Sequence, residues 1–103
     1  MIVSSSRDNT LKLWDLKLGQ ELKTLSGHQD LIWTAKVSPD GQWIASSSRD
    51  STVRVWNVET GLAVAMVKCE SAIRSLCFAE EGNSLVAGDA AGNIWLFDVR
   101  TLY

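Results

Sequence analysis

Apolar and polar residues alternate in short segments along almost the whole chain. Leu11 and Leu13 flank Lys12, and residues 53–55 repeat the arrangement, which is the period of two expected for a strand with one solvated face. Helical spacing does not persist in any long segment that is free of turn signals. We therefore predict an all-β chain of ten strands, near residues 2–6, 11–15, 21–25, 31–37, 43–48, 53–57, 62–67, 72–78, 84–87 and 93–98.

Turn-forming residues separate these segments. In Pro39-Asp40-Gly41, proline fixes φ and glycine accepts a positive φ, so the sequence predicts a tight turn. Glu80–Asn83 is expected to make the equivalent turn without proline. Gly88–Gly92 lacks the Gly-Lys-Ser/Thr ending of a phosphate-binding loop, so we interpret it as a further turn between strands.

The alternating segments belong to a longer repeat. Residues 4–8 (SSSRD) recur as residues 46–50. The strand that follows ends in Trp14-Asp15 in the first copy and in Trp56-Asn57 in the second, 42 residues later. Repeats of a fixed length indicate that one supersecondary unit is used several times.

A third, weaker copy follows the second. Residues 78–82 resemble residues 37–41, and Phe97-Asp98-Val99 resembles Trp56-Asn57-Val58 at a spacing of 41 residues. Ankyrin and tetratricopeptide arrays have shorter periods, so this spacing excludes both.

Several motifs at fixed positions in the repeat together carry a family resemblance. Gly27-His28 opens a repeat, Ser38–Gly41 (SPDG) lies in its middle, and Ser48–Thr52 (SRDST) precedes the strand that ends in Trp56-Asn57. In this combination the chain resembles the WD-repeat family over essentially its whole length. The resemblance implies an all-β fold of four-stranded antiparallel blades arranged around a central axis as a β-propeller.

The length of the chain implies an incomplete ring of about two and a half to three blades. We expect a partial first blade in residues 1–26, a complete repeat in 27–67 and a degenerate last blade in 68–103. Family strand order would begin the chain at the second strand of a blade and end it at the third strand of another. The C-terminal part of a longer propeller is therefore expected. The alternative is a chain complete as given that closes a ring as a homo-oligomer.

A Ser/His/Asp set invites comparison with a nucleophilic triad. The residues are His28, Asp50 and either Ser46 or Ser48. Neither serine lies on a strand-to-helix elbow, and no oxyanion-hole loop is recognisable, so we expect no catalytic residues. The family resemblance implies instead a buried structural hydrogen-bond chain, Asp50–His28–Ser46–Trp56, with Ser48 as the alternative to Ser46.

The other two copies keep less of this set. The first copy retains Ser4, Asp8 and Trp14, while its histidine position would precede Met1. The third copy has apolar or thiol side chains at all four positions, namely Cys69, Ala87, Ala91 and Phe97. Joint loss is physically coherent because a single surviving polar group would be buried without a partner.

Composition narrows the function classes. With 46% hydrophobic and 21% charged residues and a net charge of −2, the chain is expected to fold and not to bind nucleic acid. No apolar run is long enough for a membrane span. Cys69 and Cys77 lack metal-ligand spacing and are interpreted as free thiols in a reducing, cytoplasmic compartment, so no metal or cofactor is expected.

The resemblance also implies a binding surface around the central opening of the propeller. The positions that match the family pattern are Arg7, Leu31, Trp33, Arg49, Ala72, Arg74 and Ala90. Arginine and tryptophan are enriched at binding hot spots, which favours Arg7, Leu31, Trp33, Arg49 and Arg74 as the partner-binding set. Solvated turn residues are an equally good interpretation of Arg7 and Arg49.

Two functions follow from this combination. The first is a non-catalytic scaffold that binds a partner protein or an acidic peptide on the propeller face. The alternative is the regulatory C-terminal propeller of a larger enzyme with a nucleotide-binding or kinase domain upstream.

Overall fold

The computed structural model describes residues 1–79 and 82–98, and within these ranges the chain is all-β. Its strands are β1 (Ile2–Ser5), β2 (Leu11–Asp15), β3 (Gln20–Leu25), β4 (Ile32–Val37), β5 (Trp43–Ser48), β6 (Thr52–Asn57), β7 (Ala63–Lys68), β8 (Ile73–Phe78), β9 (Ser84–Asp89) and β10 (Ile94–Asp98). The predicted fold class is therefore confirmed, and most predicted strand ends agree within a residue. The described residues include no helix that could cross a membrane.

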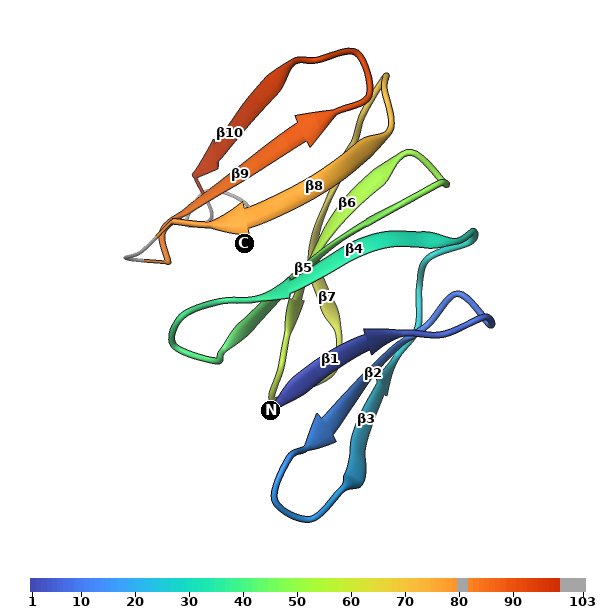
Figure 1. Ribbon diagram of the computed structural model, residues 1–103, viewed down its shortest axis with the longest axis vertical. Helices are drawn as coiled ribbons and strands as arrows, with labels where there is room; N and C mark the ends of the chain where they lie inside the picture. Colours follow the sequence, from blue (N-terminus) through green and yellow to red (C-terminus); the bar gives the residue numbers. More distant parts are fainter. Residues whose placement is uncertain (80–81, 99–103) are drawn as a thin grey trace.

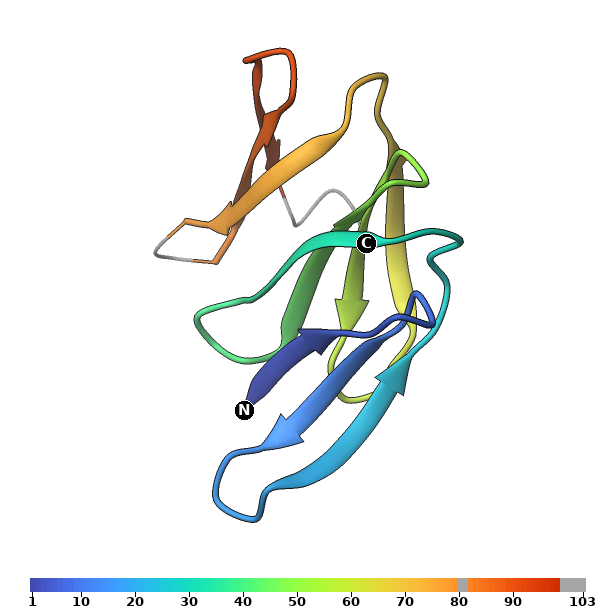
Figure 2. The same cartoon turned by 45° about the vertical axis from the view of Figure 1, so that its right-hand side comes forward.

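The strands form three antiparallel sheets that follow one another along the chain. Their strand orders are β1-β2-β3, β4-β5-β6-β7 and β10-β9-β8. Both ribbon views place the four-stranded sheet between the two three-stranded ones (Figures 1 and 2). β4 contacts β1 on one side and β8 on the other, so the sheets meet along these strands and fan outward as partial propeller blades.

The core consists of two apolar clusters on opposite faces of the middle sheet. Ile44 and Trp56 pack against buried leucines of the first sheet, which are Leu11, Leu13 and Leu25. Ala45 and Val53 pack against buried residues of the third sheet, which are Ile73, Leu76, Leu85 and Ala87. Successive side chains of a strand point to opposite faces, so Ile44 and Ala45 contribute to different clusters.

A lysine adds a polar connection between the first two sheets. Lys23, in the outer strand β3, donates hydrogen bonds to the carbonyl oxygens of Val58 (2.9 Å) and Glu59 at the β6–β7 turn. The outer part of this interface is therefore held by backbone acceptors as well as by apolar contact.

The β9–β10 turn differs from the prediction. β9 continues to Asp89 because Gly88 pairs with Ile94 and Asp89 pairs with Ile73, so the assignment of residues 88 and 89 to a turn was wrong. Asp89 then stabilises the shorter turn by accepting hydrogen bonds from the Ala91 and Asn93 amides and from the indole of Trp95.

In the predicted turn at Glu80–Asn83, Glu80 and Glu81 lie outside the described residues. The amide of Gly82 donates to the Ala79 carbonyl at 2.8 Å. The predicted strand before this turn, β8, ends at Phe78.

The turns and links that carry or adjoin the candidate binding residues lie on one side of the molecule. Figure 1 shows the β1–β2 and β5–β6 turns and the β3–β4 link along the right-hand side, with the β7–β8 link and the β9–β10 turn above them. We call this side the loop face and define it by residues 6–10, 26–33, 49–51, 69–74 and 90–93.

Candidate functional site

The four side chains of the second copy form a continuous hydrogen-bond chain. Trp56 Nε1 donates to Ser46 Oγ at 2.8 Å, Ser46 Oγ lies 2.6 Å from His28 Nε2, and His28 Nδ1 lies 3.0 Å from Asp50 Oδ2. Adjacent strands β5 and β6 supply the serine and the tryptophan, while the link before β4 supplies the histidine. The chain therefore fixes that link and the β5–β6 turn against the sheet.

The donors and acceptors of this chain define one arrangement of protons. The Asp50 carboxylate accepts the proton of His28 Nδ1, so Nε2 is left to accept the hydroxyl proton of Ser46. The oxygen of Ser46 in turn accepts from the indole of Trp56. A neutral histidine thus satisfies every polar atom between the indole and the carboxylate.

Burial keeps His28 in this neutral form. Loss of solvent lowers the pKa of His28 below its ordinary value of 6.5, and this outweighs the opposing effect of the Asp50 carboxylate. Burial also acts to raise the pKa of Asp50, but hydrogen bonds from Thr52, the Gln29 amide and His28 together hold it well below its ordinary value. Asp50 is therefore ionised beside a neutral imidazole.

The same geometry argues against nucleophilic catalysis. The Ser46 side chain is completely buried, and its oxygen already accepts a hydrogen bond from the indole of Trp56. A nucleophile must reach a substrate carbonyl, and the position of Ser46 leaves no approach from solvent. Serine, histidine and aspartate are the residue types of a hydrolase triad, but here they form a structural hydrogen-bond chain.

Ser48, the alternative to Ser46, makes different contacts. Its hydroxyl donates to the Asp30 carbonyl at 3.0 Å and accepts from the Asp50 amide at 3.1 Å. It therefore joins the β3–β4 link to the start of the β5–β6 turn and is not part of the chain that ends at Trp56.

Sequence reasoning missed a close approach beside this chain. A Cβ atom at Gly27 would lie 2.7 Å from Arg54 Nη1 and 3.0 Å from Trp56 Cη2. A larger residue at this position would have to displace the flexible end of the Arg54 side chain and would crowd the buried ring of Trp56. The signal available in the sequence was Gly27 itself, directly before His28.

The first and third copies show what happens when the set is incomplete. Trp14 Nε1 still donates to Ser4 Oγ at 2.9 Å, but Asp8 is exposed and accepts from Thr10 instead. In the third sheet, Phe97 and Cys69 pack against the apolar cluster that contains Ala87, while Ala91 lies in the exposed turn. The first sheet retains one hydrogen bond of the chain and the third replaces it with apolar packing.

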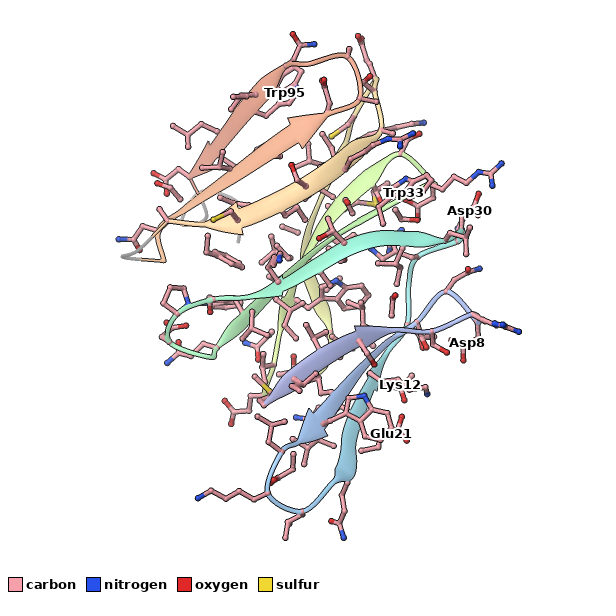
Figure 3. The ribbon with its side chains drawn as sticks, in the orientation of Figure 1. Asp8, Lys12, Glu21, Asp30, Trp33 and Trp95 are labelled. Carbon is pink, nitrogen blue, oxygen red and sulfur yellow. The ribbon has the colours of Figure 1, made fainter. Side chains whose placement is uncertain are left out.

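The candidate binding residues lie on the loop face and are largely exposed. The guanidinium carbon of Arg74 lies 5.1 Å from the centre of the Trp33 ring, a distance typical of a cation–π contact. Arg74 therefore lies over the Trp33 ring, which stays 41% exposed. Figure 3 shows Trp33 beside Asp30 at the edge of the molecule where β4 begins.

Asp30 is a loop-face residue that sequence reasoning did not select. Its carboxylate lies 3.9 Å from Arg49 Nε, and both side chains are well exposed. Leu31, the next residue, is 45% exposed. Arg49 is therefore held near a carboxylate on its own surface, although at this distance and exposure the ion pair is weak.

The remaining positions fall into a repeated backbone pattern. The Arg49 amide donates to the Leu31 carbonyl at 2.8 Å, and the Ala90 amide donates to the Ala72 carbonyl at 2.9 Å. These pairs are structurally equivalent in the second and third sheets. Arg7 lies exposed in the β1–β2 turn of the first sheet.

The cysteines and acidic residues do not gather into a site. Cys69 and Cys77 are both free thiols, and burial raises the pKa of Cys69 above its ordinary value. Within residues 1–79 and 82–98, no group of three or more histidine, cysteine or carboxylate side chains is placed to hold a metal ion.

Comparison with known proteins agrees with this geometry. The family model described as "WD domain, G-beta repeat" matches residues 1–15 and 19–57. The chain is 41% identical to the WD40 repeat-containing protein HOS15 of Arabidopsis thaliana, over 96% of this chain and 16% of that protein. It is 38% identical to the F-box-like/WD repeat-containing protein TBL1X of Mus musculus, over 97% of this chain and 19% of that protein.

A third relative is a subunit of a translation initiation factor. The chain is 34% identical to eukaryotic translation initiation factor 3 subunit I of Scheffersomyces stipitis, over 84% of this chain and 25% of that protein. The chain thus spans a quarter or less of the length of these three relatives.

Proposed function

The chain belongs to the WD40-repeat family, and from this premise we propose that it is a non-catalytic scaffold module whose loop face binds an acidic segment of a partner protein. WD repeats typically serve as protein-interaction scaffolds. By its name, one relative is a subunit of a translation initiation factor, so that protein acts as part of an assembly. The free thiols favour a reducing, intracellular location for the chain.

The observation that carries the proposal is the contact between Arg74 and Trp33. Stacking uses the flat face of a guanidinium and leaves the N–H donors at its edge available to a carboxylate. Trp33 remains 41% exposed and offers apolar area next to those donors. Arg7 and Arg49, both exposed on the loop face, supply further cations for an acidic partner.

The test compares loop-face variants with a control on another side of the full-length protein. Proteins that co-purify with the wild type are identified by mass spectrometry, and the affinity of each purified candidate is then measured for every variant. We expect Trp33→Ala and Arg49→Glu each to cost more than about 1 kcal/mol of binding free energy.

Lys17→Glu is the control, because Lys17 lies exposed in the β2–β3 turn, outside the loop face. Its affinity should stay close to that of the wild type. If the control weakens binding and the two loop-face variants do not, the partner binds elsewhere and the proposal is wrong.

A further inference from the structure

A second candidate surface lies on the outer side of the middle sheet, away from the Trp33 and Arg74 pair. It is a concavity of about 290 Å³ between the β3–β4 link and the outer strand β7. Its lining residues are Gln29, Asp50, Thr52, Arg54, Met66 and Lys68. Within β7, Met66 is paired with Arg54 and Lys68 with Thr52, so these side chains share one face of the sheet.

The concavity has an excess of positive charge. The Asp50 carboxylate is already engaged by His28, the Gln29 amide and Thr52. Arg54 is only 15% exposed, yet it makes one long hydrogen bond, from Nε to Thr52 Oγ1 at 3.3 Å, and lies 3.9 Å from Asp50. A guanidinium has five N–H donors, so Arg54 retains donors for an additional anion.

Lys68 brings a second cation to the end of β7. It is exposed and lines the same concavity as Arg54. Arg54 and Lys68 carry two positive charges here, and the nearby carboxylate of Asp50 is already hydrogen-bonded. The concavity is therefore complementary to one carboxylate of a bound partner.

The free edge of β7 adjoins this position. Among the described strands, β7 pairs with β6 alone, so its other edge presents unpaired backbone donors and acceptors. Leu62, Val64 and Met66 are 67%, 36% and 58% exposed along it. The sequence carries no charge from Gly61 to Val67.

The outer strand of the first sheet carries charges within the strand, whereas the one charged residue of β7, Lys68, lies at its end. β3 contains Glu21 and Lys23, and Glu21 forms an ion pair with Lys12 at 3.0 Å (Figure 3). Charged residues on an edge strand oppose pairing with another chain. The two edges therefore differ in their readiness to accept a further strand.

We propose that β7 binds an extended segment of a partner protein by strand addition, with an aspartate or glutamate of that segment seated between Arg54 and Lys68. Antiparallel pairing is the more stable arrangement, and it places the acidic residue at the N-terminal end of the segment, opposite Lys68. Apolar side chains at alternate positions of the segment would then cover Val64 and Met66. This surface shares Gln29 and Asp50 with the loop face but includes none of the candidate binding residues, which are Arg7, Leu31, Trp33, Arg49 and Arg74.

The probe is a fluorescent seven-residue peptide that begins with glutamate and continues with alternating threonine and valine, so that the valines share the face of the glutamate. Fluorescence anisotropy measures its binding to the full-length protein, and hydrogen exchange locates the amides it protects. We expect protection of residues 62–68. A matched peptide that begins with glutamine should bind about two- to fivefold more weakly.

Three variants complete the test. Lys68→Gln should weaken the glutamate peptide by the same factor of about two to five and leave the glutamine peptide unchanged. Val64→Lys should weaken both peptides about tenfold, because it places a charge on the pairing edge. Leu22→Lys, on the exposed part of β3, is the control and should leave both affinities unchanged.

Three outcomes would overturn the proposal. The first is the absence of peptide binding, and the second is binding that Val64→Lys and Lys68→Gln leave unaffected. The third is self-association of the wild type that Val64→Lys abolishes, in the absence of peptide binding, which would assign the edge to a second copy of the chain.

Discussion

Ser51 and Gly92 occupy equivalent positions in turns of successive sheets, and both have left-handed backbone conformations with φ of 71° and 89°. Asn9 takes the same position in the first sheet, with φ of 68°. Glycine adopts this region without steric cost and asparagine tolerates it, whereas serine has no such advantage. The second turn therefore contains backbone strain that the third avoids.

Replacing Ser51 with glycine should therefore stabilise the protein. We expect Ser51→Gly to raise the free energy of unfolding by about 0.5–1 kcal/mol, since relief of the left-handed strain exceeds the entropy cost of glycine. Urea denaturation measures the change. Ser5→Gly, in β1, is the matched control and should lower stability, so equal effects of the two substitutions would contradict this explanation.

Removal of the Asp50 carboxylate should expose the cost of an unpaired buried donor. Asp50→Ala removes the carboxylate that accepts the Nδ1 proton of His28 and leaves only the long contact of Nδ1 with Thr52 Oγ1 at 3.3 Å, so we expect the free energy of unfolding to fall by about 1–3 kcal/mol. Asp8→Ala makes the same change in the first copy, where the carboxylate is exposed and bonded to Thr10, so its loss should be clearly smaller. Equal losses would show that the contact with His28 contributes nothing.

Ser46 and Trp56 should be energetically coupled. Ser46→Ala leaves the Trp56 indole and His28 Nε2 without partners, and we expect it to cost about 1–3 kcal/mol. Adding Trp56→Phe removes one of these orphaned groups and recreates the alanine–phenylalanine pair of the third sheet. The double variant should therefore lose less stability than the sum of the single variants. Additive losses in denaturant unfolding would contradict the coupling.

The stability of the fold should fall on mild acidification. His28, the only histidine in the chain, has a lowered pKa in the folded state, so the unfolded state binds more protons as the pH falls below 6.5. The stabilisation is complete above pH 6.5 and is lost at up to about 1.4 kcal/mol per pH unit below it. Asp50, whose pKa is also lowered, adds a further loss below pH 3.8.

Urea unfolding at pH 7.5, 6 and 5 would measure this dependence, with His28→Gln as the comparison. The variant should be less stable at pH 7.5 but should show a flatter dependence between pH 7.5 and 5. A wild type as flat as the variant would mean that His28 protonates freely in the folded state.

Local patterns made most of the fold predictable. Alternation in segments such as residues 53–55 reports which face of a strand is buried, and turn residues such as Pro39 and Gly41 mark where strands end. The repeat also predicted which residues occupy equivalent positions in successive sheets. The end of β9 at Asp89 was missed because pairing with the neighbouring strands extends β9 past Gly88, and no local signal in the sequence encodes that pairing.

Contacts made by long side chains were less accessible to sequence reasoning. The approach of Arg54 to Gly27 in the β3–β4 link, and the contact of Arg74 with Trp33 between the second and third sheets, depend on how far these side chains reach. Each side chain alone is consistent with a solvated surface position. The distance between sheets, set by the packing of the whole core, decides where such side chains come to rest.

The two faces of the middle sheet have unequal consequences for local opening. The face with Ile44 and Trp56 packs against three buried leucines and lies beside the hydrogen-bond chain, whereas the face with Ala45 and Val53 presents smaller side chains to the third sheet. The first two sheets should therefore open together as one cooperative unit, and the third should exchange its amide protons at a lower free energy. Fluctuations that begin in β8–β10 would leave the histidine and its partners undisturbed.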